Sequence, residues 1–507
     1  MSKKSTTFAL VLPDRESKTP AYRWLYGALR SAILEGRLRP GSRLPATREL
    51  AKQYGLSRGT IVYAFEQLKA EGYLEGVVGS GTRVSQVLPD QLLEVGRAEP
   101  KKQARVVERS RAVSDYGRRV QLFSNLEARP TRAFRPNVPA LDLFPATLWA
   151  QVAARRLRRV STQLLLGCDT LGYLPLRRAV ADYLNASRGV QCVPEQVAIL
   201  SGVQEALDLT ARMLVNAGDR VCMENPGYTG ARSMFEAMGA QVKGIGLDDE
   251  GLRMDLAALK GARLVYITPG HQFPLGITMS LGRRLQLLEW ARKSRAVILE
   301  DDYDSEYRYS GRPVPALQGL DRHGLVLFTG SFSKVLFPAL RLGYLVLPPD
   351  LVEMFSAAIS VTSRHAPVLE QAVLCDFIVE GHFGRHLRRM REIYAERVGV
   401  LLESGRSRLA GLLAISDVEA GLQTAGWLRA GLQGSAVCKA AARRNVDVVA
   451  LSEYSHEAGV PEGVQLGFAA VDPREIRRGV EELGIALEEE WKASQGRKPP
   501  GPQAERR

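Results

Sequence analysis

Short apolar runs alternate with longer amphipathic stretches over residues 137–490, and this alternation constrains the fold more strongly than any other feature of the sequence. The apolar runs read QVAILSG, RVCMENP, RLVYITP, AVILEDD, LVLFTGSFSK and LGYLVLP, and helical patterns follow several of them. Strands that alternate with helices form βα units, which build a mainly parallel sheet with ligands at the carboxyl ends of its strands. We therefore expect an α/β domain in this part of the chain.

Positive charge is concentrated in the N-terminal part of the chain. Residues 1–135 contain 25 Lys and Arg against 13 Asp and Glu, whereas the rest contains 44 against 42. This asymmetry favours a basic nucleic-acid-binding module joined to a near-neutral domain, with a merely solvated basic face as the alternative. Residues 86–135 lack sustained periodicity, so we expect a flexible basic linker there, and the Pro-rich residues 493–507 predict a disordered tail.

Several classes of protein are disfavoured by the sequence. Polar residues interrupt the N-terminus before a signal-type apolar stretch develops, and no uncharged run approaches the roughly 18 residues that a membrane helix requires. The five cysteines form no CxxC pair, which argues against a zinc site or a disulfide framework. His382 and His386 lie four residues apart without a third ligand, so a helix surface or an interdomain role is favoured over a metal. We expect a cytoplasmic protein with no metal and no membrane association.

Residues 15–85 predict a winged helix-turn-helix. An apolar face indicates a helix over residues 22–34, and a second helix over 47–54 is expected to have Thr47 as its cap. After the Gly55 turn, Ser57 can cap a third helix that extends to about residue 70. Residues 72–84 read as a β-hairpin whose tip, 79–82, can approach a groove closely because of its glycines. The predicted fold places the first turn of the third helix where side chains reach base edges and phosphates.

The segment from GRLRPGSRLPATRELAKQYGLSRGTIVYAFEQLKAEGYLEG to GSGTRV closely resembles the GntR-type DNA-binding domain. Two residues depart from that family pattern, since Val77 stands where a basic residue is frequent and Arg83 where an aromatic residue is usual. The resemblance implies that double-stranded DNA is contacted by Arg43, Arg48, Ser57, Arg58, Thr60, Gly81 and Thr82.

Three polar motifs follow predicted strands of the second domain. SGVQEALDL, residues 201–209, turns directly into a helix whose first N–H groups can bind an anion. ILEDDYDSEYRY delivers three consecutive carboxylates, whose repulsion a cation such as a buried pyridinium nitrogen would offset. SFSKVLFPALRLG places Lys334 and Arg341 in an apolar run, where burial would penalise each charge. A desolvated lysine provides a neutral amine for imine formation, and arginine suits phosphate.

These groups match the aldehyde, ring nitrogen and phosphate of pyridoxal 5′-phosphate. Together with LFPATLW, GYLPLRRAVADYL, ENPGYTGAR, ITPGHQFPLGITM and EGHFGRHLRRMREIY, they make residues 136–492 similar to fold-type I aminotransferases, with a smaller C-terminal α+β subdomain. The whole chain resembles the MocR subfamily of GntR-type transcription regulators. The resemblance implies that Lys334 forms the Schiff base, an internal aldimine, that Asp301 meets the pyridine nitrogen, and that Tyr228 stacks on the ring.

Further cofactor contacts are implied by the same resemblance. Tyr303 is expected near the ring hydroxyl, and either His271 or Gln272 borders that hydroxyl. The residues expected around the phosphate are Arg341, Ser331, Ser333, Gly202, Val203 and Gln204.

The resemblance implies a regulator that senses pyridoxal phosphate, an amino compound or both, and that forms a homodimer with each winged helix reaching over its partner. The alternatives are a genuine aminotransferase that carries a DNA-binding domain, and a plain repressor whose second domain is only a dimerisation scaffold. Gln465 stands where aminotransferases have an arginine that binds the substrate carboxylate, and a neutral amide loses that bidentate ion pair. We therefore expect a sensor rather than an enzyme, with no catalytic residue.

Overall fold

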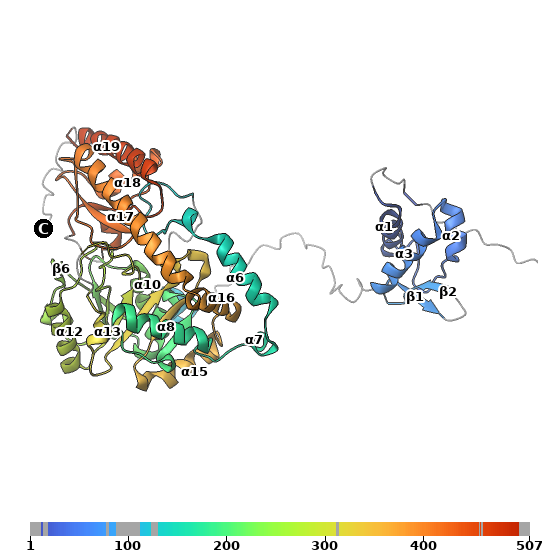
Figure 1. The fold of residues 1–507 in the computed structure, drawn as a ribbon, viewed down its shortest axis with the longest axis horizontal. Coiled ribbons are helices and arrows are strands. Elements are labelled where there is room, and N and C mark those ends of the chain that lie inside the picture. Colours follow the sequence, from blue (N-terminus) through green and yellow to red (C-terminus); the bar gives the residue numbers. More distant parts are fainter. Residues whose placement is uncertain are drawn as a thin grey trace, which may run out of the picture. The chain divides into compact units, whose positions relative to one another are not determined.

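The computed structural model describes residues 12–13, 19–77, 81–87, 112–122, 130–310, 314–455, 457 and 460–495. The chain divides into two compact units, residues 1–111 and 112–507, each with its own core (Figure 1). None of the described helices combines the length and the apolar run that crossing a bilayer requires.

The N-terminal unit is the expected winged helix-turn-helix. Helices α1 (Ala21–Leu34), α2 (Thr47–Tyr54) and α3 (Arg58–Ala70) precede a hairpin of β1 (Leu74–Val77) and β2 (Gly81–Val84). The helices bury a shared apolar core because their apolar residues recur at helical spacing. This core includes Leu25, Leu29, Leu50, Ile61, Phe65 and Leu68. Leu12 packs against the same core, and the indole N–H of Trp24 donates to the carbonyl of Pro13.

Local capping signals explain the helix boundaries in this unit. Ser57 is the N-cap of α3, as predicted, and its Oγ accepts a hydrogen bond from the backbone N–H of Thr60 at 3.1 Å. Gly55 ends α2 in the left-handed region, with a φ of 66°. The prediction that Thr47 caps α2 is wrong, because Thr47 is already helical and Ala46 is the N-cap. The Glu49 carboxylate accepts from the Ala46 N–H instead.

A seven-stranded sheet forms the centre of the second unit, in the order β3-β11-β10-β9-β8-β4-β5. β11 runs antiparallel to its neighbours and the other pairs are parallel, which confirms the mainly parallel α/β prediction. The strands are β3 (Val197–Leu200), β4 (Arg220–Glu224), β5 (Gln241–Ile245), β8 (Ala262–Ile267), β9 (Val297–Asp302), β10 (Val326–Ser331) and β11 (Gly343–Val346).

Helices cover both faces of this sheet because successive side chains of each strand point to opposite faces. One face packs against α9 (Val203–Leu214), α10 (Thr229–Met238) and α15 (Val352–Thr362). The opposite face packs against α8 (Leu174–Arg188), α12 (Leu281–Ser294) and α16 (Val368–Val379). The remaining elements before the small sheet are α6 (Ala146–Arg158), α7 (Thr162–Leu166), β6 (Leu247–Asp248), β7 (Gly251–Leu252), α11 (Leu256–Leu259), α13 (Leu317–Leu320) and α14 (Phe332–Val335).

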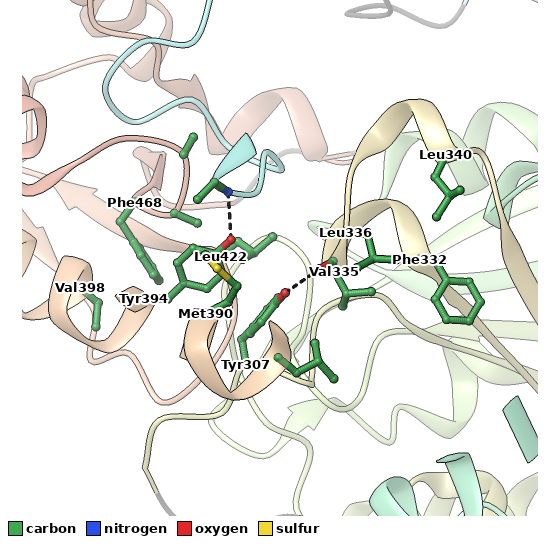
Figure 2. Close-up of a cluster of buried hydrophobic side chains, with 14 of the residues drawn as sticks. Tyr307, Phe332, Val335, Leu336, Leu340, Met390, Tyr394, Val398, Leu422 and Phe468 are labelled. Atoms are coloured by element: carbon green, nitrogen blue, oxygen red, sulfur yellow. Dashed lines mark hydrogen bonds between the residues drawn. The ribbon is translucent and has the colours of Figure 1, made fainter. Parts of the chain in front are cut away.

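The predicted C-terminal α+β subdomain is present as an antiparallel sheet in the order β12-β13-β15-β14. Its helices α17, α18 and α19 lie together in Figure 1, and α17 extends from them toward α16. The hydroxyl oxygen of Tyr394 on α17 accepts a hydrogen bond from the backbone N–H of Ala140 at 2.9 Å (Figure 2). The elements are β12 (Leu413–Ile415), β13 (Gln423–Leu428), β14 (Val449–Ala450), β15 (Gly463–Gly467), α17 (His382–Arg408), α18 (Gly434–Arg443) and α19 (Pro473–Gln495).

Two segment boundaries differ from the sequence prediction. The expected linker, 86–135, contains the short helix α5 (Asp115–Arg119), and Arg119 donates to the carbonyl of Ala237 at 3.0 Å. Ala133 and Phe134 are fully buried and form bridges to the small sheet and its flank, so they belong to the second unit. The expected tail, 493–507, begins too early, because α19 continues to residue 495. Most of the remaining linker and tail lies outside the described residues.

Candidate functional site

Lys334 lies on α14, a single turn that follows β10 directly. Ser331 is the N-cap of this turn, and its Oγ accepts from the N–H of Ser333 at 3.1 Å. The backbone carbonyl of Val335, the residue after Lys334, accepts from the Tyr307 hydroxyl (Figure 2) and from His386 Nε2, both at 3.1 Å. These contacts from two other segments fix the backbone that carries the lysine.

The Lys334 side chain is half-buried, and its Nζ donates to the carbonyl of Asn137 at 2.9 Å. Burial lowers the pKa of the Lys334 ammonium to about 8, although the carboxylates of Asp304 and Asp301 oppose this shift. A lysine with this pKa is partly neutral near physiological pH and can act as a nucleophilic amine.

Strand β9 ends in three consecutive carboxylates, Glu300, Asp301 and Asp302. Because successive side chains of a strand point to opposite faces of the sheet, Asp301 is separated from the other two. Glu300 accepts from the N–H groups of Leu317 and Gln318 on one face of the sheet. Asp302 is on the same face and forms an ion pair with Arg188 at 2.7 Å. Arginines therefore offset part of the repulsion, Arg188 of α8 at Asp302 and Arg284 of α12 at Glu300.

Asp301 points to the opposite face of the sheet. Its Oδ2 accepts from the Tyr266 hydroxyl at 2.7 Å, and its buried Oδ1 has no hydrogen-bond partner among the described residues. Burial raises the pKa of Asp301 to about 7, against the opposing effect of the Tyr266 hydrogen bond. A buried carboxylate oxygen without a partner is unfavourable, so this geometry fits a protonated nitrogen of a bound molecule.

An anion cradle lies where β3 turns into α9. Gly202 is the N-cap of α9 with a φ of 116°, a conformation that favours glycine. A Cβ built on Gly202 would lie 3.6 Å from Nη2 of Arg341, which places the guanidinium beside the first turn of the helix. Ser333 Oγ is buried and has no described hydrogen-bond partner. A helix N-terminus and a guanidinium together suit a phosphate group.

Arg341 itself adopts a φ of 50°, which is uncommon for a residue other than glycine. The expectation that burial penalises this charge is wrong, because the Arg341 side chain is exposed. Lys334, in contrast, is half-buried, and burial lowers its pKa.

Aromatic side chains surround the same region. Tyr228 follows β4 and its hydroxyl accepts from Nε2 of Gln204 at 2.8 Å. The Tyr303 hydroxyl lies 3.0 Å from Nδ1 of His271, which also contacts the Asp304 carboxylate at 2.9 Å. The structure thus pairs Tyr228 with Gln204 and Tyr303 with His271, and the ring of Phe273 contacts both tyrosines.

The buried side chain of Gln272 is hydrogen-bonded to neighbouring groups of the protein. Its Nε2 donates to the carbonyls of Pro226 and Phe273, and its Oε1 accepts from the N–H of Leu275. Of His271 and Gln272, His271 is the one whose side chain contacts Tyr303.

Sequence reasoning missed several residues of this site. Asn137 accepts the Lys334 hydrogen bond through its backbone carbonyl, Gln423 binds the Asn137 backbone, and Tyr266 holds Asp301. A backbone carbonyl has no signature in the sequence, and the other contacts join residues that are far apart along the chain.

The two histidines of the GHFGRH segment do not form a metal site. His386 is buried and binds the Val335 carbonyl, and burial lowers its pKa, so the helix-surface assignment is wrong for this residue. His382 lies 3.1 Å from the Glu380 carboxylate. Within the described ranges, no group of three or more His, Cys, Asp or Glu side chains could hold a metal ion.

The candidate DNA-binding residues gather on α2, α3 and the wing. Arg43, Arg48 and Arg58 are exposed. The Arg43 guanidinium lies beside Gly81, since a Cβ placed on this glycine would be 3.4 Å from Nε of Arg43. The hydroxyl groups of Ser57 and Thr60 are 2.8 Å apart, so they bind each other at the start of α3. Thr82 is partly exposed on β2, whereas residues 79 and 80 of the predicted tip lie outside the described residues.

Two exposed apolar residues on α3 were missed. Val62 is 39% exposed and lies four residues after Arg58, so it shares the face of the helix that carries this arginine. Tyr63 is 60% exposed and its ring meets the edge of Tyr22. An apolar residue within a helix suggests a core position, so the exposure of these two side chains could not be predicted from the sequence. Arg83, which departs from the family pattern, donates to the carbonyl of Gly41 within its own domain.

Comparison with known proteins defines the class of this chain. Residues 21–84 match the family of bacterial regulatory proteins called the gntR family, and residues 137–483 match aminotransferase class I and II. With the fold described above, these matches define a helix-turn-helix transcription regulator with an aminotransferase-like domain. The chain is 40% identical over 482 residues to the probable rhizopine catabolism regulatory protein MocR of Rhizobium meliloti, covering 94% of this chain and 96% of that protein. It belongs to the MocR-type regulators.

Two further similarities agree with this family. The pyridoxine biosynthesis transcriptional regulator PdxR of Corynebacterium glutamicum is 29% identical, and the match covers 90% of this chain and 94% of PdxR. The α-aminoadipate aminotransferase LysN of Thermus thermophilus has a solved structure with N-(5′-phosphopyridoxyl)-L-leucine. That structure aligns with a TM-score of 0.66 and 30% identity, over 71% of this chain and 92% of LysN. The resemblance stated from the sequence is confirmed.

Proposed function

We propose that this regulator binds pyridoxal 5′-phosphate at Lys334 and responds to the cofactor, alone or with an amino compound, by changing how its winged helix binds double-stranded DNA. The observation that carries the proposal is the pair of buried, unpartnered atoms, Asp301 Oδ1 and Ser333 Oγ, in the site that also contains Lys334 and Arg341. Each of these groups would complement a different part of the cofactor.

The residues fit the cofactor in the following way. Asp301 would hold a proton on the ring nitrogen, while Ser333, Arg341 and the first turn of α9 would bind the phosphate. Tyr228 would lie against the ring, with its hydroxyl held by Gln204. When bound, the cofactor supplies an aldehyde that combines with an amine, and the Lys334 amine is the group placed to do so.

The pKa of Lys334 predicts how cofactor loading depends on pH. Only the neutral amine can attack an aldehyde, and the neutral fraction increases about tenfold per pH unit below the pKa of about 8. We expect the rate of absorbance change, after mixing cofactor-free protein with pyridoxal phosphate, to rise between pH 6.5 and 8 and to level off above about 8.5. A rate that kept rising with unit slope to pH 9.5 would instead indicate an ordinary, unshifted lysine.

The winged helix is proposed to contact DNA through Arg43, Arg48, Ser57, Arg58, Thr60, Gly81 and Thr82. Arg58 begins α3 and is exposed, so its guanidinium is free to reach either a base edge or a phosphate.

We expect Arg58→Ala to weaken binding to a site selected from random-sequence DNA by about tenfold or more. If Arg58 reads a base, affinity for unrelated DNA should fall much less than affinity for the selected site. If it holds a phosphate, both affinities should fall equally and the salt dependence should weaken. Lys69→Ala is the matched control, because this substitution removes one positive charge from the last turn of the same helix. Unchanged affinities for Arg58→Ala would remove this residue from the interface.

We also propose that two copies of the chain associate, with each winged helix reaching over the partner. Apolar side chains that would suit such an interface are exposed on α7 and at the end of α15: Leu165, Leu166 and Val361, at 63%, 85% and 83% exposure. A sedimentation mass of one chain, 55.7 kDa, at micromolar concentration would contradict this assembly.

A sensor is favoured over a working aminotransferase by the residue at position 465. Gln465 is buried in β15 and carries no charge, so it offers no ion pair to a substrate carboxylate. We propose that the domain binds its ligands without sustained turnover.

A further inference from the structure

Gln465 has an unusual environment for a buried amide. Its side chain is completely buried in β15, and its Oε1 accepts a hydrogen bond from the Tyr454 hydroxyl at 2.7 Å. Its Nε2 has no hydrogen-bond partner among the described residues. Since a buried donor without a partner is unfavourable, the amide N–H groups of Gln465 are available to a ligand.

The sheet register shows which way this amide faces. In the antiparallel pair β13 and β15, Gln465 lies opposite Ala425, and Gly467 lies opposite Gln423. Because side chains alternate along a strand, Gln423 and Gln465 are on the same face of the small sheet. Gln423 Oε1 accepts from the N–H of Asn137, whose carbonyl accepts from Lys334. Gln465 therefore lies on the face of the small sheet that is directed toward Lys334.

The surroundings of Gln465 are aromatic. The Tyr454 ring meets the edge of Phe273 at a centroid distance of 5.0 Å, and Phe273 in turn contacts the rings of Tyr228 and Tyr303. These four rings belong to one apolar cluster that also includes Leu451 and Ala425. A ligand that reaches Gln465 from Lys334 would thus be bordered by aromatic rings.

Among the described residues, neither the members of this aromatic cluster nor the polar groups beside it, Gln423, Gln465 and His271, include a lysine or an arginine. Gln423 and Gln465 are neutral amides, Tyr303 and Tyr454 are phenols whose pKa values burial raises, and His271 contacts the Asp304 carboxylate. A carboxylate buried against such groups would lack the cation that its desolvation requires. A hydroxyl group needs only a hydrogen bond, which Nε2 of Gln465 can donate.

We propose that the amino compound sensed by this protein presents a neutral hydroxyl group, and not a carboxylate, to Nε2 of Gln465. The chemical class is a primary amine that bears hydroxyl groups, as in amino alcohols. This inference rests on the proposed function, because it names the kind of amine that the site near Lys334 accepts.

The test compares three amines with one carbon skeleton: alaninol, alanine and isopropylamine, which carry a hydroxyl, a carboxylate or neither. Full-length protein loaded with pyridoxal phosphate is titrated with each amine, and binding is measured from absorbance and from the melting temperature. We expect alaninol to bind at least about tenfold more tightly than alanine. We expect it to bind about three- to tenfold more tightly than isopropylamine, as for one neutral hydrogen bond. Leucinol and leucine repeat the comparison with a larger side chain.

Gln465→Leu should remove the advantage of alaninol over isopropylamine, because leucine keeps the volume but has no donor. Gln433→Leu is the matched control, since Gln433 is exposed in the same part of the chain and should leave that advantage unchanged. Alanine binding as tightly as alaninol, or an alaninol advantage that survives in Gln465→Leu, would overturn the inference.

The design also separates failure of the inference from failure of the proposed function. If the protein shows no cofactor absorbance that borohydride can reduce, the proposed function is wrong at its first step. If that absorbance is present but none of the amines changes it or the melting temperature, cofactor binding stands, and both amine sensing and this inference fail.

Discussion

Replacing Lys334 with alanine should abolish the absorbance that appears when the protein is loaded with pyridoxal phosphate and that borohydride makes permanent. The lysine amine is the only group in the proposed site that can form a carbon–nitrogen bond to the aldehyde, while Asp301, Ser333 and Arg341 bind through hydrogen bonds and charge. The covalent bond to the cofactor should therefore be lost completely, although the protein can still bind the cofactor weakly. Mass spectrometry after borohydride treatment provides the measurement.

The fold should survive this substitution, because the Lys334 side chain is half-buried and its one hydrogen bond among the described residues is to the Asn137 carbonyl. An unchanged melting temperature of the cofactor-free variant, within a few degrees, would separate loss of chemistry from loss of structure. Lys293→Ala is the control, since Lys293 is exposed on α12 and pairs only with Glu289. A reducible adduct of normal yield in Lys334→Ala would show that another amine carries the cofactor.

The bounds of the winged helix could be predicted from the sequence because its signals are local. Ser57, Gly55 and the apolar spacing of α3 determine where the helices begin and end within a few residues of themselves. The cap of α2 was misplaced by one residue, since Thr47 is a good capping residue and Ala46 is not. The carboxylate of Glu49, three residues further along the chain, accepts from the Ala46 N–H at the start of this helix.

The candidate cofactor site was predicted in part. Polar motifs at the ends of β3, β9 and β10 gave Gly202, Asp301 and Lys334, because strands of a parallel sheet deliver their carboxyl ends to one edge. The two-residue period of a strand places Asp301 on the opposite face from its two neighbours in the EDD motif. That alternation explains why only one of the three carboxylates is left with an unpartnered oxygen.

The contacts that hold the site come from the small sheet and could not be predicted. Asn137 and Gln423 are separated by 286 residues, and Asn137 and Lys334 by 197, so no local pattern connects them. The sequence favours a helix surface or an interdomain role for His386 over a metal, because no third ligand accompanies it and arginines surround it. In the folded chain, one side of α17 is buried, and His386 lies on that side against the backbone of α14.

Incubation of the purified protein with common amino donors and 2-oxoglutarate should give no appreciable keto acid. Transamination requires the substrate to be held so that one C–H bond is placed over the cofactor ring, and a misplacement of about 1 Å can reduce the rate about a hundredfold. The position that would anchor an α-carboxylate is Gln465, whose only described hydrogen bond is to Tyr454. Sustained turnover at about 1 per second or faster would make the aminotransferase alternative the better description.

Gln465→Arg provides the complementary test, because it adds a cation at the same point of β15. Tighter binding of alanine is expected from the new ion pair, together with at most a weak half-reaction, since Tyr454 and the aromatic wall are arranged around a smaller, neutral amide. Gln433→Arg, at an exposed position, controls for the added charge. Slow turnover has a consequence for signalling, because a receptor that consumed its ligand would erase the signal it reports. If Gln465→Arg gained full turnover while the unchanged protein had none, one buried side chain would separate a sensor from an enzyme on this fold.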